Sequence, residues 1–319
     1  MPNDHFIPRF YLKNFEIPGR PAWIYSYKRG HKPVPLAIRS VASATDFYTL
    51  KTPQIDVPQN APDEFLKRLE SVAAPIVKKL LSAARLELSY GEAMILSMFV
   101  GFLAARTPMA RQKALNVHLA MRMRLVKDLA ENRDEYEKLV SKLNLAKTPE
   151  EAELARQGLL DPEKNLMMSF EGDVDDFSLQ KSFKTGELLT EILLGKKWVL
   201  VEARAEQKFV TSDNPFVTLA PEPYTPGMDV NAINAECLFP ISPQRALLFS
   251  NKIGGNSIYK VGKDRMSSWI WQIISFGFET VFASFSSDYV KREFDQIPAG
   301  EITKVPISSL PPVLPLMER

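Results

Sequence analysis

The stretch Ala93-Met-Ile-Leu-Ser-Met-Phe-Val-Gly-Phe-Leu-Ala-Ala105 is the longest apolar run in this chain of 319 residues. A helix that crosses a bilayer needs about 20 apolar residues, so the run is too short for a membrane segment. It is apolar almost all round, which is typical of a helix buried at the centre of a protein. The sequence therefore predicts a central core helix here and no membrane role.

Helical periodicity continues upstream of this run. Apolar residues from Phe65 to Leu81 recur at i, i+3 and i+4 spacing, and the segment from Asn60 to Asp63 supplies a helix start. Pro75 lies inside the pattern, and proline removes a helical hydrogen bond. The sequence therefore predicts a helix from Pro62 onward with a kink at Pro75, or a break there between two helices.

Downstream, the helical pattern runs from Tyr90 to about Leu145. Its second half, over residues 121–142, carries charges on most faces and is typical of a solvated helix. Thr148-Pro-Glu-Glu151 then combines an N-cap residue, a proline in the first turn and two acids near the positive end of the helix dipole. Another helix is expected over residues 148–157.

The two ends of the chain favour strands. Near the N-terminus we expect extended segments at Ala22–Lys28 and Asp46–Leu50, with Pro33 and Pro35 in an exposed loop between them. After a helix at Thr185–Leu194, the pattern predicts strands or extended segments and one further helix. The strands are expected at Trp198–Ala203, Lys208–Leu219, Leu238–Leu248 and Thr280–Ser284, and the helix at Asp264–Glu279.

This order of elements predicts an α+β fold, since helices and strands come in separate runs and do not alternate. We expect a helical middle region packed on a mixed or antiparallel sheet formed by N-terminal and C-terminal strands. We also expect a single domain over residues 1–319, with N-terminal strands and loops (1–60), a helical region (61–195) and a strand-rich region (196–319).

The composition is that of an ordinary globular protein, with 45% hydrophobic and 24% charged residues. The net charge of +2 gives no overall excess for binding a polyanion. The one cysteine, Cys237, excludes an internal disulfide, and its apolar neighbours indicate a buried structural thiol. The N-terminus lacks the layout of a signal peptide. Together these features predict a cytoplasmic protein.

Several common catalytic motifs are missing from the sequence. The three histidines, His5, His31 and His118, lie far apart and form no zinc-binding spacing. There is no Walker A sequence, no Gly-x-Gly-x-x-Gly and no Gly-x-Ser-x-Gly. The sequence thus identifies no cofactor, although a metal site made of one histidine with carboxylates stays open.

The first polar block is His5-Phe-Ile-Pro-Arg9. His5 changes its charge near neutral pH, and Arg9 is a permanent cation with a planar fork of donors. Together they are suited to bind a phosphate or carboxylate, with the imidazole as general acid or base. In the alternative reading, the apolar side chains Phe6, Phe10, Leu12 and Phe15 pin a terminal segment onto the core, and His5 is structural.

The second polar block is Thr211-Ser-Asp-Asn-Pro215, which follows a β-branched, apolar segment. At a strand end, Asp213 is placed to orient a histidine or pair with an arginine, and Asn214 to offer a donor and an acceptor to a ligand. Ser212 adds a hydroxyl. The alternative reading is an Asx-turn followed by proline, which Asp-Asn-Pro favours.

A third candidate is Arg106, which follows the apolar run, together with Glu70 beside the apolar stripe of the preceding helix. An unpaired buried charge is costly, so Arg106 needs an anionic or polar partner. Either the two residues pair with each other, or they line a pocket with Asp213.

The pattern His5-Phe-Ile-Pro-Arg-Phe-Tyr-Leu-Lys-Asn-Phe15 resembles that of a mainly bacterial family catalogued as domain of unknown function 4238. Where family members tend to carry an asparagine in the late helix, this chain has Trp269-Ile-Trp271. Further matches follow in the family's order over residues 3 to 285: Asp46-Phe-Tyr48, Glu70, Arg106-Thr-Pro108, Phe209-Val-Thr-Ser-Asp-Asn-Pro215 and Pro240-Ile-Ser-Pro243.

The resemblance implies no activity, but it favours one shared site over two unrelated polar blocks. The first hypothesis is a hydrolase of a phosphoester or similar anionic substrate, with its residues converging in one pocket. In this hypothesis His5 is the general acid or base, and Asp213 either orients His5 or binds a metal. The substrate is bound by Arg9, Glu70, Arg106, Ser212 and Asn214.

Two alternatives stay open. One is a non-enzymatic module that binds a ligand or a protein, in which the same polar groups are buried and satisfy one another. The other is a nucleic-acid-binding protein or nuclease that uses a basic helix face without interleaved aromatic residues. That face consists of Arg111, Lys113, Arg122, Arg124 and Lys127.

Overall fold

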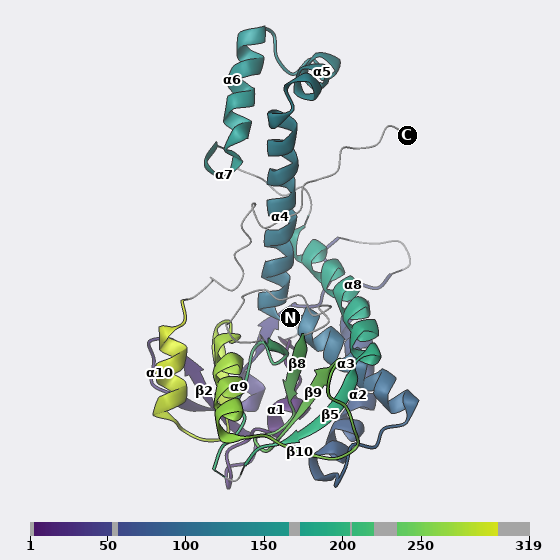
Figure 1. The fold of residues 1–319 in the computed structure, drawn as a ribbon, viewed down its shortest axis with the longest axis vertical. Helices are drawn as coiled ribbons and strands as arrows, with labels where there is room; N and C mark the ends of the chain where they lie inside the picture. The colour runs from purple at the N-terminus through teal and green to yellow at the C-terminus, as the bar shows by residue number, and fades with distance from the viewer. Residues whose placement is uncertain (1–2, 53–56, 166–172, 205, 220–234, 299–319) are drawn as a thin grey trace. The chain divides into compact units, whose positions relative to one another are not determined.

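The computed structural model describes residues 3–52, 57–165, 173–204, 206–219 and 235–298 (Figure 1). The chain divides into two compact units. The first draws on Met1–Arg111 and Asp175–Ile302, and among described residues the second draws on Gln112–Val174. The helical region predicted for residues 61–195 is therefore shared between them, and the single domain stays a prediction. The predicted α+β fold is confirmed, with helices in the middle of the chain and sheets formed from both ends.

The apolar run forms the core helix that the sequence predicts, α3 (Tyr90–Ala105). A capping box starts it: the Ser89 side chain accepts from the backbone N–H of Glu92, whose carboxylate accepts from the backbone N–H of Ser89. Nine residues between Leu96 and Ala105 are buried. In the described part of the chain no single helix is long and apolar enough to cross a membrane. By length and composition alone, α3 would be long enough only if it were counted together with the helix at Pro108–Glu131, from which a sharp bend separates it.

Helix α2 (Ala61–Ser82) packs beside α3 and is one continuous helix, so the predicted break at Pro75 is wrong. Pro75 lies on the exposed side of α2. Water can therefore satisfy the Ser71 carbonyl that loses its helical donor, which lowers the cost of an internal proline.

Helix α8 (Val174–Gly195) begins earlier than the sequence predicts and contacts α3 closely at two glycines. A Cβ atom added to Gly101 of α3 would lie 2.9 Å from the Gly186 carbonyl oxygen and 3.0 Å from the Thr190 backbone nitrogen. The two helices approach this closely because neither residue carries a side chain.

In the described residues the strands of the first unit form three sheets. The order of the largest is β10-β5-β9-β8-β7, antiparallel except for the parallel pair of β10 and β5, and that of the second is β3-β2-β11-β6, antiparallel throughout. The third is the pair β1 and β4. The bounds are β1 Asn3–His5, β2 Trp23–Lys28, β3 Val34–Ala37, β4 Ser43–Thr45, β5 Lys197–Glu202, β6 Thr211–Ser212, β7 Val217–Leu219, β8 Glu236–Pro240, β9 Arg245–Ser250, β10 Tyr259–Lys260 and β11 Thr280–Ala283.

Two expectations about the N-terminal strands are wrong. Pro35 lies within β3, not in a loop; β3 is an edge strand, where a missing backbone donor is tolerated. The second strand occupies Ser43–Thr45 and not residues 46–50, because Asp46 has a φ of 52° and ends it in the left-handed region. Farther along, the single extended segments expected at 208–219 and 238–248 are each two strands, β6 with β7 and β8 with β9.

The remaining helices of the first unit are short. They are α1 (Arg9–Lys13), the 3-10 helix η1 (Ile38–Ser40), α9 (Lys263–Ser275) and α10 (Asp288–Gln296), of which α9 and α10 lie side by side (Figure 1). The single helical stretch expected from Tyr90 to Leu145 is wrong, since it divides into α3, α4 (Pro108–Glu131) and α5 (Arg133–Leu143). The second unit also contains α6 (Pro149–Leu160), capped by Thr148 as predicted, and α7 (Pro162–Asn165).

Candidate functional site

The N-terminal segment is anchored to the core on both sides of the first polar block. Strand β1 pairs with β4, with His5 opposite Ser43. After it, Ile7, Leu12 and Phe15 have no exposed surface. The anchoring that the structural reading of this block predicts is therefore present, and it fixes where His5 and Arg9 lie.

His5 is half-buried, and its Nε2 is enclosed without a hydrogen-bond partner in the described chain. Burial and the positive charge of Arg9 lower the pKa of His5 below its usual value, although hydrogen bonding to the backbone of Ile38 and Arg39 and the charge of Glu70 oppose this. The imidazole is therefore neutral at pH 7. Since Nε2 is unpartnered, its hydrogen bonding to the backbone involves Nδ1, which leaves Nε2 as a lone-pair acceptor.

Arg106 ends α3 and pairs with Glu70, which is one of the two arrangements open from the sequence. Its Nη2 donates to Glu70 Oε1 at 2.6 Å, and its Nε donates to the Phe6 carbonyl at 3.2 Å. Burial disfavours the cation, but Tyr48 and Glu70 outweigh burial and raise the pKa of Arg106. Within the described residues its Nη1 makes no hydrogen bond.

Tyr48 completes this group. Its side chain is 2% exposed, and its hydroxyl has no hydrogen-bond partner among described residues. The Arg106 guanidinium carbon lies 5.6 Å from the centre of the Tyr48 ring. Burial raises the pKa of Tyr48 above its usual value, so the phenol keeps its proton. We call His5, Tyr48, Glu70 and Arg106 the His5 cluster.

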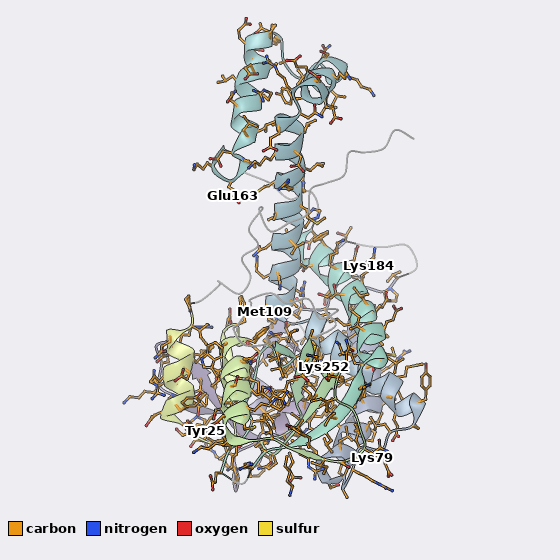
Figure 2. The ribbon with its side chains drawn as sticks, viewed as in Figure 1. Tyr25, Lys79, Met109, Glu163, Lys184 and Lys252 are labelled. Carbon is orange, nitrogen blue, oxygen red and sulfur yellow. The ribbon has the colours of Figure 1, made fainter. Side chains whose placement is uncertain are left out.

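The turn after α3 joins this cluster to the second polar block. The Thr107 hydroxyl accepts from the backbone N–H of Ala110 and so caps α4, and it donates to Asn214 Oδ1 at 3.4 Å. The Asn214 amide donates to the Phe276 carbonyl at 3.3 Å and lies 3.5 Å from the sulfur of Met109, which Figure 2 labels. Both the oxygen and the nitrogen of the buried Asn214 side chain therefore have partners.

Asp213 has partners other than His5. Its carboxylate accepts from the backbone N–H groups of Phe278, Glu279 and Thr280 at 2.8, 2.7 and 2.9 Å. Burial outweighs these donors and raises the pKa of Asp213 to about 6. The preceding Ser212 hydroxyl accepts from the backbone N–H of Asn214, so the turn is closed by serine and not by an Asx side chain.

The loop from Gly277 to Thr280 is held from two directions. Asp213 accepts from its amides, and Arg29 donates to the carbonyls of Gly277 and Phe278. The charge of Asp213 also acts on Arg29. We therefore assign Asp213 a positioning role for this loop.

The structure brings His5, Glu70 and Arg106 together, with the exposed Arg9 in electrostatic range of His5. Asn214 joins them through Thr107, whereas no interaction between His5 and Asp213 is found among described residues. Tyr48 is not among the site residues predicted from the sequence. The signal that points to it is its position in Asp46-Phe-Tyr48, the one match outside the two polar blocks that contains an aromatic hydroxyl.

Other reactive groups lie away from this cluster. Cys237 is fully buried in β8, and burial raises the pKa of its thiol to about 11, as suits a structural cysteine. In the described ranges no three side chains of His, Cys, Asp or Glu gather in a way that would hold a metal ion.

Comparison with known proteins agrees with the resemblance seen in the sequence. Neither the curated proteins nor the solved structures contain a significant match to this chain. The family model described as "Protein of unknown function (DUF4238)" matches residues 3–294, which include every residue of the His5 cluster and the turn at Asp213. With nearly the whole chain covered by that model, this protein belongs to the DUF4238 family.

Proposed function

We propose that this protein binds a small anionic ligand of the phosphomonoester class at the His5 cluster. The observation that carries the proposal is the pair of buried polar atoms, His5 Nε2 and Tyr48 Oη, that have no partner among described residues. An unpartnered buried polar group costs about 1–3 kcal/mol, so two of them in the cluster that contains the Glu70–Arg106 pair favour a site that a ligand completes.

The chemistry of these groups selects the ligand. Tyr48 Oη and Arg106 Nη1 are donors suited to an anionic oxygen, and the exposed Arg9 adds positive charge. The neutral His5 offers Nε2 as an acceptor and so requires a donor hydroxyl on the same ligand. A singly protonated phosphate group supplies an anionic oxygen for the donors and a hydroxyl for His5 Nε2. Both atoms are buried, so binding requires a local opening at the cluster.

Tyr48→Phe is expected to weaken binding of inorganic phosphate by about 5–10-fold, because it removes a donor to the anion. The same substitution leaves the unfolding temperature unchanged or raises it, since it deletes a hydroxyl with no partner. Isothermal titration calorimetry and thermal unfolding measure the two effects.

Tyr25→Phe, which removes a hydroxyl outside the cluster, is the matched control and is expected to bind phosphate like the wild type (Figure 2). Sulfate, which lacks a proton at neutral pH, is expected to bind more weakly than phosphate. Equal affinity of Tyr48→Phe and wild type for phosphate, or no phosphate binding at all, would count against the proposal.

Hydrolysis of a bound phosphoester is the second candidate, favoured by the state of His5. A neutral imidazole with a free Nε2 is equipped to take a proton from water as a general base. Because its pKa is lowered, the base stays active down to a pH below 6.5. Asp213 enters this candidate as the residue that positions the loop from Gly277 to Thr280.

His5→Asn is expected to lower the turnover of p-nitrophenyl phosphate by about 100-fold or more and to remove the loss of turnover on the acid side of the pH profile. Arg68→Gln, at an exposed arginine without a side-chain hydrogen bond in the described chain, serves as the control. A wild type that binds phosphate but hydrolyses no phosphoester would leave binding as the function and remove hydrolysis.

Nucleic-acid binding receives less support. Arg111 is buried and donates to Ser178 and to the carbonyls of Phe47 and Asp175, so it is not available on a basic helix face. Arg124 pairs with Asp128. We further propose a cytoplasmic location, which the single buried cysteine favours.

A further inference from the structure

A cavity in the first unit is lined by none of the residues of the His5 cluster. Its volume is about 590 Å³, within the usual range for small-molecule sites. Its walls come from the end of α1, the last turn of α2, the end of β5 and the turn between β8 and β9, elements that can be located in Figure 1. The residues used below are Asn14, Leu81, Glu202, Ser242, Gln244 and Arg245.

Asn14 supplies the first sign of a missing partner. Its backbone N–H donates to the Tyr11 carbonyl at the end of α1, which fixes the main chain. Its side chain makes no hydrogen bond with the described residues, and Nδ2 is buried. A half-turn of the amide exchanges Nδ2 with Oδ1, so the donor that is buried in this conformation can be turned toward a ligand in the cavity.

Arg245 also lines the cavity and is held by hydrogen bonds to the end of α2. Its Nη1 donates to the carbonyls of Leu80 and Ala83 at 2.7 and 2.8 Å, where it closes the end of α2. Its Nη2 lies 3.6 Å from Glu202 Oε2, which is an ion pair but exceeds hydrogen-bond distance. The arginine and the carboxylate therefore both keep hydrogen-bonding capacity.

Ser242 adds one more donor. Its hydroxyl oxygen accepts from the backbone N–H groups of Gln244 and Arg245, at 3.2 and 3.0 Å. The hydroxyl proton is then left to donate. The cavity thus combines three donors, on Asn14, Ser242 and Arg245, with one carboxylate acceptor on Glu202, and its charges sum to zero.

We infer that this cavity binds a free α-amino acid, whose carboxylate accepts from Asn14, Ser242 and Arg245 and whose ammonium donates to Glu202. The zwitterion matches the neutral sum of charges, and it brings a carboxylate for the donors and an ammonium for the Glu202 carboxylate. A phosphate dianion would meet the Glu202 carboxylate, and a simple cation would leave the donors unused. Leu81 gives the amino acid's side chain an apolar wall.

The test is titration of the full chain with glycine, L-alanine and L-glutamine, followed by calorimetry and by saturation-transfer NMR. At least one of them is expected to bind saturably with a Kd below about 1 mM. Acetate and methylamine, each half of the zwitterion, are expected to bind about 10-fold more weakly or not at all.

Asn14→Ala is expected to weaken binding about 5-fold and Glu202→Gln more than about 10-fold, with unchanged unfolding temperatures. Glu187→Gln, at an exposed carboxylate on α8, is the matched control. The inference is overturned if none of the twenty protein amino acids binds up to about 10 mM, or if both variants bind like the wild type. His5 and Tyr48 variants leave this binding intact, so the proposed function is tested independently.

Discussion

Asp213→Ala is expected to lower the free energy of unfolding by about 4 kcal/mol, because it leaves three backbone N–H groups without an acceptor. Those groups belong to Phe278, Glu279 and Thr280, and Asp213 is 4% exposed, so water does not replace the carboxylate. The substitution also removes the negative charge of Asp213, which favours the protonated form of Arg29. Denaturant unfolding at pH 7 measures the change. Asp264→Ala, at an exposed acid in the first turn of α9, is the control and is expected to change stability by no more than about 0.5 kcal/mol.

Asp213→Asn separates the charge from the hydrogen bonds. Burial raises the pKa of Asp213 from 3.8 to about 6, so between pH 4 and pH 6 the folded protein binds a proton that the unfolded chain has released. This contribution therefore stabilises the wild type as the pH falls from 6 toward 4. Asparagine does not titrate, so the difference in stability between wild type and Asp213→Asn is expected to grow by about 2.5 kcal/mol from pH 7 to pH 4. A constant difference would show that the carboxylate carries an ordinary pKa.

Gly101→Ala is expected to destabilise the protein by about 2–3 kcal/mol through the close approach of α3 and α8. The new methyl group would lie 2.9 Å from the Gly186 carbonyl oxygen, a backbone atom that moves only if α8 shifts. In the same helix, a methyl group at Gly91 would meet nothing within 4 Å. Gly91→Ala is therefore expected to stabilise the protein by about 0.5 kcal/mol, through helix propensity alone.

These two glycine variants form a matched pair, since both replace a glycine of α3 by alanine. Thermal and denaturant unfolding compare them directly. Equal unfolding free energies for Gly101→Ala and Gly91→Ala would show that α8 leaves room for a Cβ atom at Gly101 in solution, against the 2.9 Å that separates such an atom from the Gly186 carbonyl oxygen here.

The local sequence pattern was sufficient to predict those helices and strands that depend little on the rest of the fold. The α3 helix is apolar over its length and is capped by Ser89, while β2 alternates its side chains over Trp23–Lys28, so both were predictable. Misplaced elements depended on context. Pro75 is tolerated because one side of α2 faces water, and Pro35 because β3 is an edge strand, and neither fact is written in a local pattern.

The candidate site divides in the same way. The need of Arg106 for an anionic partner follows from its place after an apolar helix, so Glu70 was within reach of sequence reasoning. The partners of Asp213 were not, because they are backbone amides about sixty-five residues later, and any residue type presents an amide. Tyr48 and Asn14 were missed for a related reason. Each is distinguished by a buried polar atom without a hydrogen-bond partner, and only the folded structure shows which atoms are buried.

The four-stranded sheet sets an order of events during synthesis. Its strand β2 pairs on one side with its neighbour β3 and on the other with β11, whose residues Thr280–Ala283 leave the ribosome some 250 residues later. At the usual speed of translation, the hairpin of β2 and β3 waits about 10–50 seconds with one edge unpaired. Chaperone binding or premature association during this interval would act on that edge, and completion of the sheet would end the exposure.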